Sequence, residues 1–251
     1  MDFRGLIAHG EPATYFTFRS LTELGVPHAT TTRYFGAVTS PTQAAPPFQA
    51  EAASALRGIG LDFARLTYAR QVHGADVAVA PAGGGFAGAV DVMVTRERAV
   101  PMAIFTADCL AVTIYDPVPP ALVVAHVGWR GTVRGAAPAA VGALRDAGGQ
   151  PGRSIVTIAP SIGPCCYEVD EPVIGDFAER YPDLWERWMA AAGPGRWMLD
   201  LWTANEELLM RAGIGAARID NPRVCTACHP ELLYSYRKGH RGRLVTVAAL
   251  P

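Results

Sequence analysis

The feature that most constrains the fold is a pair of apolar runs at the centre of the chain, within residues 101–135. The first run covers residues 102–106 and 110–115, the second covers residues 121–127, and both are rich in β-branched and other apolar side chains. Runs of this length that are bounded by turn residues are typical of buried strands. The proline-rich link at residues 116–120 is short, so the strands on its two sides are predicted to be neighbours in space.

Three polar residues interrupt these apolar runs and do not suit a plain core. Asp108 and Cys109 divide the first run, and His126 lies near the end of the second. Neighbouring strands would bring the Cys109 thiol close to the His126 imidazole. The sequence GWRG follows at once, and the chain then turns helical. A thiol, an imidazole and a carboxylate beside a strand-to-helix turn indicate a reaction site.

The composition is that of a globular protein. Half of the 251 residues are hydrophobic, 18% are charged and the net charge is −1, which gives no electrostatic basis for binding nucleic acid or an anionic membrane. The N-terminus lacks the pattern of a signal peptide, and no apolar run is long enough to span a bilayer. Five cysteines, two of them adjacent, suit thiols or metal ligands better than a disulfide framework. We therefore expect a cytoplasmic protein that binds neither nucleic acid nor membrane.

The rest of the chain mixes strands and helices without strict βαβ alternation. Further strands are predicted at residues 26–35, 89–95 and 155–159 and at the C-terminus, and the strand at 89–95 carries one buried-looking acid, Asp91. A loop over residues 39–47 leads to a helical stretch at 50–61, and other helices are predicted at residues 132–147, 171–181 and 200–212. No convincing domain boundary interrupts the chain, so residues 1–251 are predicted to form a single α/β (α+β) domain with mixed sheets.

Two imidazoles and one thiol suggest a metal site. His73, Cys109 and His126 each occupy a strand end or a turn, and together they make a three-ligand set for zinc with the fourth position left to water. A zinc ion so held lowers the pKa of its water towards neutrality. The wide spacing of the three residues matches no compact metal motif, so the residues alone equally allow a buried free cysteine beside two hydrogen-bonded histidines.

Four further polar residues are candidates for the site. Asp108 is a partner for a ligand imidazole or a proton carrier, and it shares a side with Cys109 only if the strand ends there, because adjacent strand residues face opposite ways. Arg130, at a helix start, is an anion-binding residue or an ordinary ion-pair partner. Gln71, in a polar turn, and Ser161, in a stiff polar loop, are candidates for substrate binding.

The remaining cysteines give a weaker signal. Cys225 and Cys228 form a C-x-x-C pair, which is half of a structural zinc site, but no second pair lies nearby in the sequence. The adjacent Cys165 and Cys166 lack the usual ligand spacing, so the sequence does not favour structural zinc. True multicopper chemistry is disfavoured as well, because none of the six histidines forms a His-x-His pair. A lone His₂Cys copper site remains compatible with the ligand types.

Six segments resemble one known family when they are taken together in order: RQVHGADV, DVMVT, TADCLAVTIYD, AHVGWRGT, IAPSIGPCCYEV and CTACHPELLYSYR. The chain is similar to the laccase-like polyphenol oxidases, a family also described as multifunctional purine nucleoside enzymes. The resemblance implies a four-layer αββα-type fold shared with the deamidase domain of cytotoxic necrotising factor toxins. It also implies a zinc ion held by His73, Cys109 and His126.

The same resemblance implies particular reactions. They are the phosphorolysis of adenosine, inosine, guanosine and methylthioadenosine, and the deamination of adenosine to inosine; some members are instead associated with peptidoglycan editing. One departure from the family pattern affects the N-terminal block, where Thr31-Thr32-Arg33 is kept but the sequence YFGA replaces a glycine pair. The C-terminal sequence RKGH also differs from the family's usual Arg-Arg-Asp.

The sequence thus leads to the hypothesis of a zinc-dependent enzyme that acts on purine nucleosides and phosphate. Asp108 would take the role that a glutamate has in other zinc deaminases, and Arg33 and Arg130 would hold phosphate. A competing hypothesis is a Cys–His hydrolase or deamidase with Cys109 as nucleophile and His126 as base. The same residues also allow a copper-binding polyphenol oxidase or a non-catalytic metal-binding protein.

Overall fold

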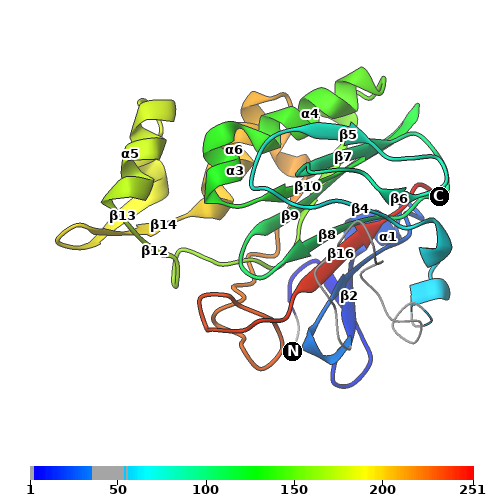
Figure 1. The fold of residues 1–251 in the computed structure, drawn as a ribbon, viewed down its shortest axis with the longest axis horizontal. Coiled ribbons are helices and arrows are strands. Elements are labelled where there is room, and N and C mark those ends of the chain that lie inside the picture. The colour runs from blue at the N-terminus through cyan, green and yellow to red at the C-terminus, as the bar shows by residue number, and fades with distance from the viewer. Residues whose placement is uncertain (1–2, 36–53, 55) are drawn as a thin grey trace.

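Two mixed β-sheets pack face to face at the centre of the structure, a computed structural model in which residues 3–35, 54 and 56–251 are described (Figure 1). Within these residues, the larger sheet has seven strands in the order β1-β2-β3-β16-β8-β4-β6. They are β1 (Leu6–His9), β2 (Tyr15–Phe18), β3 (His28–Thr31), β16 (Leu244–Ala248), β8 (Met102–Thr106), β4 (Thr67–Tyr68) and β6 (Gly85–Phe86). The second sheet has the order β15-β11-β9-β10-β7-β5. Its strands are β15 (Ile219–Asp220), β11 (Ile155–Ile158), β9 (Leu110–Pro117), β10 (Pro120–Val127), β7 (Val92–Thr95) and β5 (Val77–Val79).

The central apolar runs form strands, as predicted, but they belong to different sheets. β9 and β10 are antiparallel neighbours, paired from Pro117 with Pro120 to Leu110 with Val127, which confirms that the strands on the two sides of the proline-rich link are neighbours. β8, by contrast, pairs with β16 and β4 in the other sheet. The chain therefore passes from one sheet to the other at residues 107–109, where Asp108 has a φ of +93°.

Four layers follow from the way the apolar side chains are distributed. The layer between the sheets includes Met93, Ile104 and Leu122, all of which are buried. On the outer face of the six-stranded sheet lie α3 (Trp129–Arg134), α4 (Ala136–Asp146) and α6 (Leu201–Arg211). The outer face of the seven-stranded sheet packs on apolar residues of the segment that precedes β4, among them Leu56 and Leu61. The mixed α/β class predicted from the sequence is confirmed.

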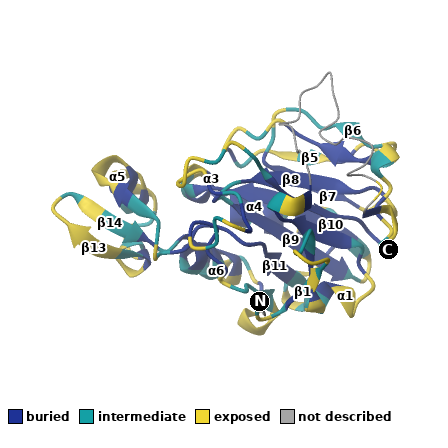
Figure 2. Ribbon diagram, turned by 90° about the horizontal axis from the view of Figure 1, so that it is seen from below, coloured by how far each residue is buried: buried dark blue, intermediate teal, exposed yellow. Residues whose placement is uncertain are grey.

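A small unit stands apart from the two sheets at one end of the molecule (Figure 2). It contains α5 (Glu171–Arg180) and an antiparallel sheet of β12 (Glu168–Asp170), β14 (Arg196–Leu199) and β13 (Met189–Gly193). Shorter elements complete the described chain: α1 (Arg19–Thr22) and the 3₁₀ turns Arg33–Phe35, Phe63–Arg65, Pro151–Arg153, Trp185–Trp188 and Ala216–Arg218. None of the described helices combines the length and the apolar composition needed to cross a bilayer.

Several predicted boundaries are wrong, and each has a physical reason. The single helix predicted at 132–147 is divided at Gly135, whose φ of +86° ends α3 in the left-handed conformation that helix C-termini favour. The strand predicted at 26–35 stops at Thr31, because the chain then turns into the 3₁₀ segment Arg33–Phe35. Helices near 171–181 and 200–212 are confirmed as α5 and α6. The loop predicted at 39–47 and residues 50–53 and 55 of the helical stretch predicted at 50–61 lie outside the described residues. Within the described part of that stretch, residues 54, 56 and 57 are helical and the chain turns at residues 58–60.

Two glycine substitutions should change stability in opposite directions. A Cβ at Gly163 would lie 2.4 Å from the Trp202 ring, which is buried and donates a hydrogen bond to Ser161. Gly163→Ala should therefore lower the free energy of unfolding by about 1–3 kcal/mol. Gly142, inside α4, has open space around its Cα, so Gly142→Ala should raise that free energy by about 0.5–1 kcal/mol. Urea unfolding of both variants measures the effect, and a stability of Gly163→Ala equal to that of the parent would contradict the packing of Trp202 on Gly163.

Candidate active site

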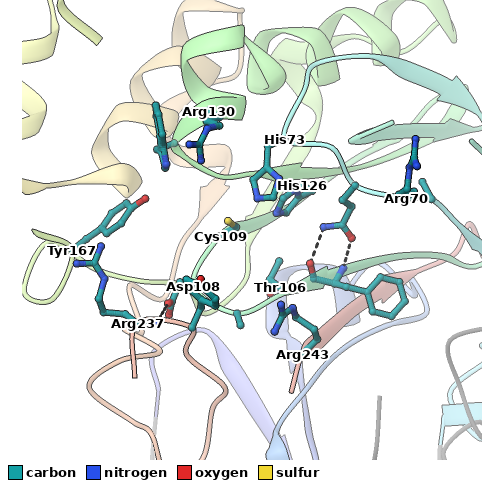
Figure 3. A pocket seen from close by; sticks show the side chains of 16 residues that line it. Arg70, His73, Thr106, Asp108, Cys109, His126, Arg130, Tyr167, Arg237 and Arg243 are labelled. Carbon is teal, nitrogen blue, oxygen red and sulfur yellow. Dashed lines mark hydrogen bonds between the residues drawn. The ribbon is translucent and has the colours of Figure 1, made fainter. Parts of the chain in front are cut away.

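A cavity of about 770 Å³ opens where the chain passes between the two sheets (Figure 3). Because β8 ends at Thr106 and β9 begins at Leu110, strand alternation does not apply to Asp108 and Cys109, and both line this cavity. The complete lining consists of Ala69, Arg70, Gln71, His73, Phe105, Thr106, Ala107, Asp108, Cys109, His126, Trp129, Arg130, Tyr167, Tyr236, Arg237 and Arg243. Chemically active groups from both halves of the chain therefore meet in one place.

Two imidazoles and a thiol converge in this cavity. One donor atom from each of His73, Cys109 and His126 lies within 4.8 Å of the other two. The two imidazole rings are 4.8 Å apart between centroids and nearly perpendicular. His126 belongs to β10, Cys109 precedes β9, and His73 sits in a turn with a φ of +57°. The predicted trio is thus brought together from three separate segments.

Asp91 organises this group, although its sequence pattern indicated only a buried acid in a strand. Its fully buried carboxylate accepts a hydrogen bond from His126 Nδ1 at 2.8 Å. It also accepts backbone N–H bonds from Val72 at 3.1 Å, His73 at 3.0 Å and Gly74 at 2.7 Å. One carboxylate therefore fixes both the His126 ring and the turn that carries His73. The imidazole-orienting contact considered for Asp108 is made by Asp91 instead.

The Cys109 thiol and the His126 imidazole shift each other's pKa. Burial raises the pKa of Cys109, but the charge of His126 and hydrogen bonds to His126 and His73 outweigh it and bring the pKa to about 6. Burial lowers the pKa of His126, but the Cys109 charge and the hydrogen bond to Asp91 raise it to about 9. In the protein without metal, the pair therefore exists at neutral pH as thiolate and imidazolium.

The donor set and the space around it fit a metal ion. A thiolate and two imidazoles are ligands that zinc and copper both accept. A Cβ at Gly128 would lie 2.7 Å from Cys109 Sγ and 3.4 Å from His73 Cδ2. Glycine at position 128 thus leaves room for the Cys109 thiol and the His73 ring.

Arginines give the cavity a positive character. Arg70, Arg130, Arg237 and Arg243 all line it, and Figure 3 shows their side chains around the cluster. The guanidinium of Arg130 stacks over the Trp129 ring at 4.2 Å, and that of Arg237 lies 5.3 Å from the Tyr167 ring. Such stacking restrains the guanidinium groups. The cavity is therefore suited to an anionic ligand.

Tyr167 and Asp108 supply a hydrogen-bond donor and an acceptor on one wall. Burial, followed by the charge of Cys109, raises the pKa of the Tyr167 phenol, so it stays protonated at neutral pH. Asp108 accepts hydrogen bonds from Thr226 Oγ1 at 2.6 Å and from the backbone N–H of Arg237 at 2.7 Å. Each carboxylate oxygen keeps a second lone pair, so Asp108 still has capacity to accept a proton or hydrogen bond from a ligand.

The other predicted substrate-binding residues lie in different surroundings. Gln71 lines the cavity, and its amide exchanges two hydrogen bonds of 2.8 Å with the backbone of Phe105. Arg33 and Ser161 are not among the lining residues. Arg33 donates to the Pro230 carbonyl and packs over Tyr234, and Ser161 is buried and accepts from Trp202 at 2.7 Å. The structure therefore gives Arg33 and Ser161 packing contacts rather than positions in the cavity.

The chain is similar to a family model, to several curated proteins and to solved structures. The family model described as "Multi-copper polyphenol oxidoreductase laccase" matches residues 47–251, which include the whole cavity lining. A purine nucleoside phosphorylase of Streptomyces coelicolor is 38% identical over 76% of this chain and 77% of that protein. An adenosine deaminase from an unknown prokaryotic organism is 32% identical over 59% of this chain and 57% of that protein. The hypothetical protein YfiH of Bacillus licheniformis shares the fold, with a TM-score of 0.87 at 24% identity over 99% of this chain and 100% of that one.

Replacing Asp91 should weaken metal binding while the protein stays folded. In Asp91→Asn the amide NH₂ would face N–H donors that the carboxylate now satisfies, so both His126 and the turn of His73 lose their fixed positions. We expect metal affinity to fall about 10–100-fold, which is typical when a carboxylate behind a ligand histidine is lost. A competition titration with a chelating dye measures it. Asp76→Asn, at an exposed acid in the same segment, is the control, and equal affinity of the two variants would contradict the role of Asp91.

Proposed function

The chain belongs to the multi-copper polyphenol oxidoreductase laccase family, and from that premise we propose that it is a metal-dependent enzyme acting on purine nucleosides. Relatives named purine nucleoside phosphorylase and adenosine deaminase support the substrate class. The observation that carries the proposal is the convergence of His73, Cys109 and His126 in an arginine-lined cavity. The substrates would be small molecules, a purine nucleoside and either water or phosphate.

His73, Cys109 and His126 would hold the metal, and zinc is the ion that we assign. A zinc ion bound there supplies a Lewis acid that lowers the pKa of water towards neutrality. Copper suits the same ligands, but the dioxygen chemistry of a multicopper oxidase needs many more histidines. The chain has six in all, of which His73 and His126 line the cavity. Asp91 keeps the His126 ring in one orientation, so the donor atoms are in place before the ion arrives.

For deamination, the protein's own residues would hold the base and move protons. Water adds to C6 of adenosine, ammonia leaves, and the product is inosine. The rings of Trp129 and Tyr236 offer stacking surfaces for the purine. Asp108 would accept the proton of the attacking water and pass it to the departing amino group. Tyr167 would donate a hydrogen bond to a ring nitrogen.

For phosphorolysis, the arginines of the cavity would hold phosphate against the ribose. A phosphate oxygen forms a bond to C1′ while the bond from C1′ to the purine nitrogen breaks, and the purine leaves with that electron pair and takes up a proton. Arg130 and Arg237 are suited to bind phosphate, because each is restrained by an aromatic ring. Arg33, considered for this role from the sequence, packs elsewhere, so we assign the role to the arginines that line the cavity.

Product analysis tests the proposal directly. Purified protein of known metal content is incubated with adenosine, with and without phosphate, and the products are separated by chromatography. We expect inosine, and adenine with ribose 1-phosphate only when phosphate is present. Cys109→Ala should lose at least about 100-fold in both rates, because it removes a donor from the cluster. Zinc-loaded protein that forms none of these products would contradict the proposed function.

A second function is favoured by one arrangement, the chain of hydrogen bonds from Asp91 to His126 to Cys109. This is the order of acid, base and nucleophile in Cys–His–Asp hydrolases. In an amidase or deamidase, the Cys109 thiolate would bond to the carbonyl carbon, ammonia would leave with a proton from His126, and water would release the acid from the thioester. Such an enzyme needs no metal.

Alkylation separates the two functions. If Cys109 is a metal ligand, chelation should abolish activity, added zinc should restore it, and bound zinc should protect Cys109 from iodoacetamide. If Cys109 is a nucleophile, the chelated protein should hydrolyse amides, and iodoacetamide should abolish that activity. Because Cys165 and Cys228 are exposed and can react as well, the alkylated residue is identified by mass spectrometry of peptides. Full nucleoside activity in chelated protein would contradict the metal-dependent proposal.

A further inference from the structure

The four cysteines that the cavity does not use gather in a second cluster. The sulfur atoms of Cys165, Cys166, Cys225 and Cys228 all lie within 4.8 Å of one another. The Sγ of Cys228 is 3.4 Å from that of Cys165 and 3.5 Å from that of Cys166. The fifth cysteine of the chain, Cys109, belongs to the cluster with His73 and His126.

This cluster is produced by pairing between distant segments. Ser161, after β11, forms an isolated parallel bridge with Cys225. The Ser161 N–H donates to the Val224 carbonyl, and the Thr226 N–H donates to the Ser161 carbonyl, both at 3.1 Å. The loop with the adjacent cysteines therefore lies beside the C-x-x-C turn. Sequence spacing could not indicate this, because more than fifty residues separate the two pairs.

We propose that Cys165, Cys166, Cys225 and Cys228 bind one zinc ion as a structural four-thiolate site. Zinc–sulfur bonds of about 2.3 Å in a tetrahedron separate the sulfurs by roughly 3.8 Å. The separations of 3.4 and 3.5 Å, with every pair inside 4.8 Å, require only small side-chain adjustments to reach that arrangement. On binding, the thiols release their protons to solvent, and the ion changes no oxidation state.

The backbone around Cys225 suits a metal-bound thiolate. Its sulfur accepts a hydrogen bond from the Gly163 N–H at 3.3 Å, which would partly neutralise a thiolate charge. The Cys228 N–H donates to the Cys225 carbonyl at 3.2 Å, so a tight turn directs both sulfurs of the C-x-x-C pair to one point. Cys225 is buried while Cys165 and Cys228 are exposed, so the ion would be held from inside and could enter from solvent.

The consequence of such a site would be a rigid wall for the cavity. Cys166 directly precedes Tyr167, whose ring lines the cavity, and Thr226, between Cys225 and Cys228, donates a hydrogen bond to Asp108. A zinc ion would therefore fix the loops that carry Tyr167 and Thr226 relative to each other. The proposal concerns structure and stands whether or not the cavity binds nucleosides.

Metal counting in full-length variants tests the site. Cys109→Ala removes one of the three donors in the cavity. This variant is purified under reducing conditions and loaded with zinc. It should then retain one zinc ion per chain, bound by the four cysteines, as measured by mass spectrometry of the metal. Adding Cys165→Ser and Cys228→Ser, both at exposed positions, should remove that zinc. Cys109→Ala alone is the matched control, because it replaces a cysteine outside the site. A metal-free Cys109→Ala protein, or zinc that persists after both serine substitutions, would overturn the proposal.

The ligand type is tested on the unmodified four-cysteine cluster. Cobalt loaded into Cys109→Ala should give intense sulfur-to-cobalt absorption and tetrahedral visible bands, and X-ray absorption of the zinc form should require sulfur neighbours only. These measurements do not depend on whether the serine variants fold. A protein mass that is lower by two hydrogens for each disulfide bond, together with the loss of two titratable thiols, would identify disulfides and overturn the proposal. Iron bound in preference to zinc would overturn the zinc assignment.

Discussion

The passage of the chain from one sheet to the other at residues 107–109 is the constraint on which the cavity depends. Asp108 adopts a left-handed backbone conformation, which costs on the order of 1–3 kcal/mol outside glycine. Its carboxylate accepts hydrogen bonds from Thr226 and Arg237, and these offset the cost. Because of this turn, Cys109 lies directly before the start of β9 on the side of His126 instead of in the layer between the sheets. The C-terminal segment thus supports the conformation that positions the thiol.

Asp91 has the corresponding role on the other side of the cluster. A single buried carboxylate that receives three backbone N–H bonds and one imidazole bond has no free side for solvent, so its position is fixed by the fold. The His73 turn and the His126 ring are thereby held without any contact from the ligand. Preorganisation of this kind means that little conformational entropy is lost when the cluster binds a cation or its protonation state changes.

Local pattern was enough to predict the β9–β10 hairpin, α5 and α6, because apolar periodicity and turn residues determine such elements within a short window. The local pattern did not predict the helix boundary at Gly135, because a single residue in the left-handed conformation ends α3 there and separates it from α4. The trio of His73, Cys109 and His126 was named from residue type and family resemblance. Asp91 was noticed only as an acid in an apolar strand, since its partners are 17 to 35 residues away in the chain. The four-cysteine cluster has the same cause, because the pairing between the segment after β11 and the segment after β15 is not visible in sequence spacing.

The Cys109 sulfur and the His126 imidazole could serve either as metal ligands or as nucleophile and base. One molecule cannot use them in both ways at once. Because the pKa of Cys109 is lowered to about 6, the thiolate predominates at neutral pH, so a cation would have few protons to displace from the sulfur. The proton that must leave is on His126, whose raised pKa reflects the thiolate charge that a cation would neutralise. A metal held by Cys109 and His126 would neutralise the thiolate charge that supports the imidazolium, so His126 would release its proton and the Cys109 sulfur would no longer be a free nucleophile. Under the proposed function, the Asp91–His126–Cys109 arrangement would therefore serve first as a preformed cation site, and it would act as a catalytic triad only without the metal.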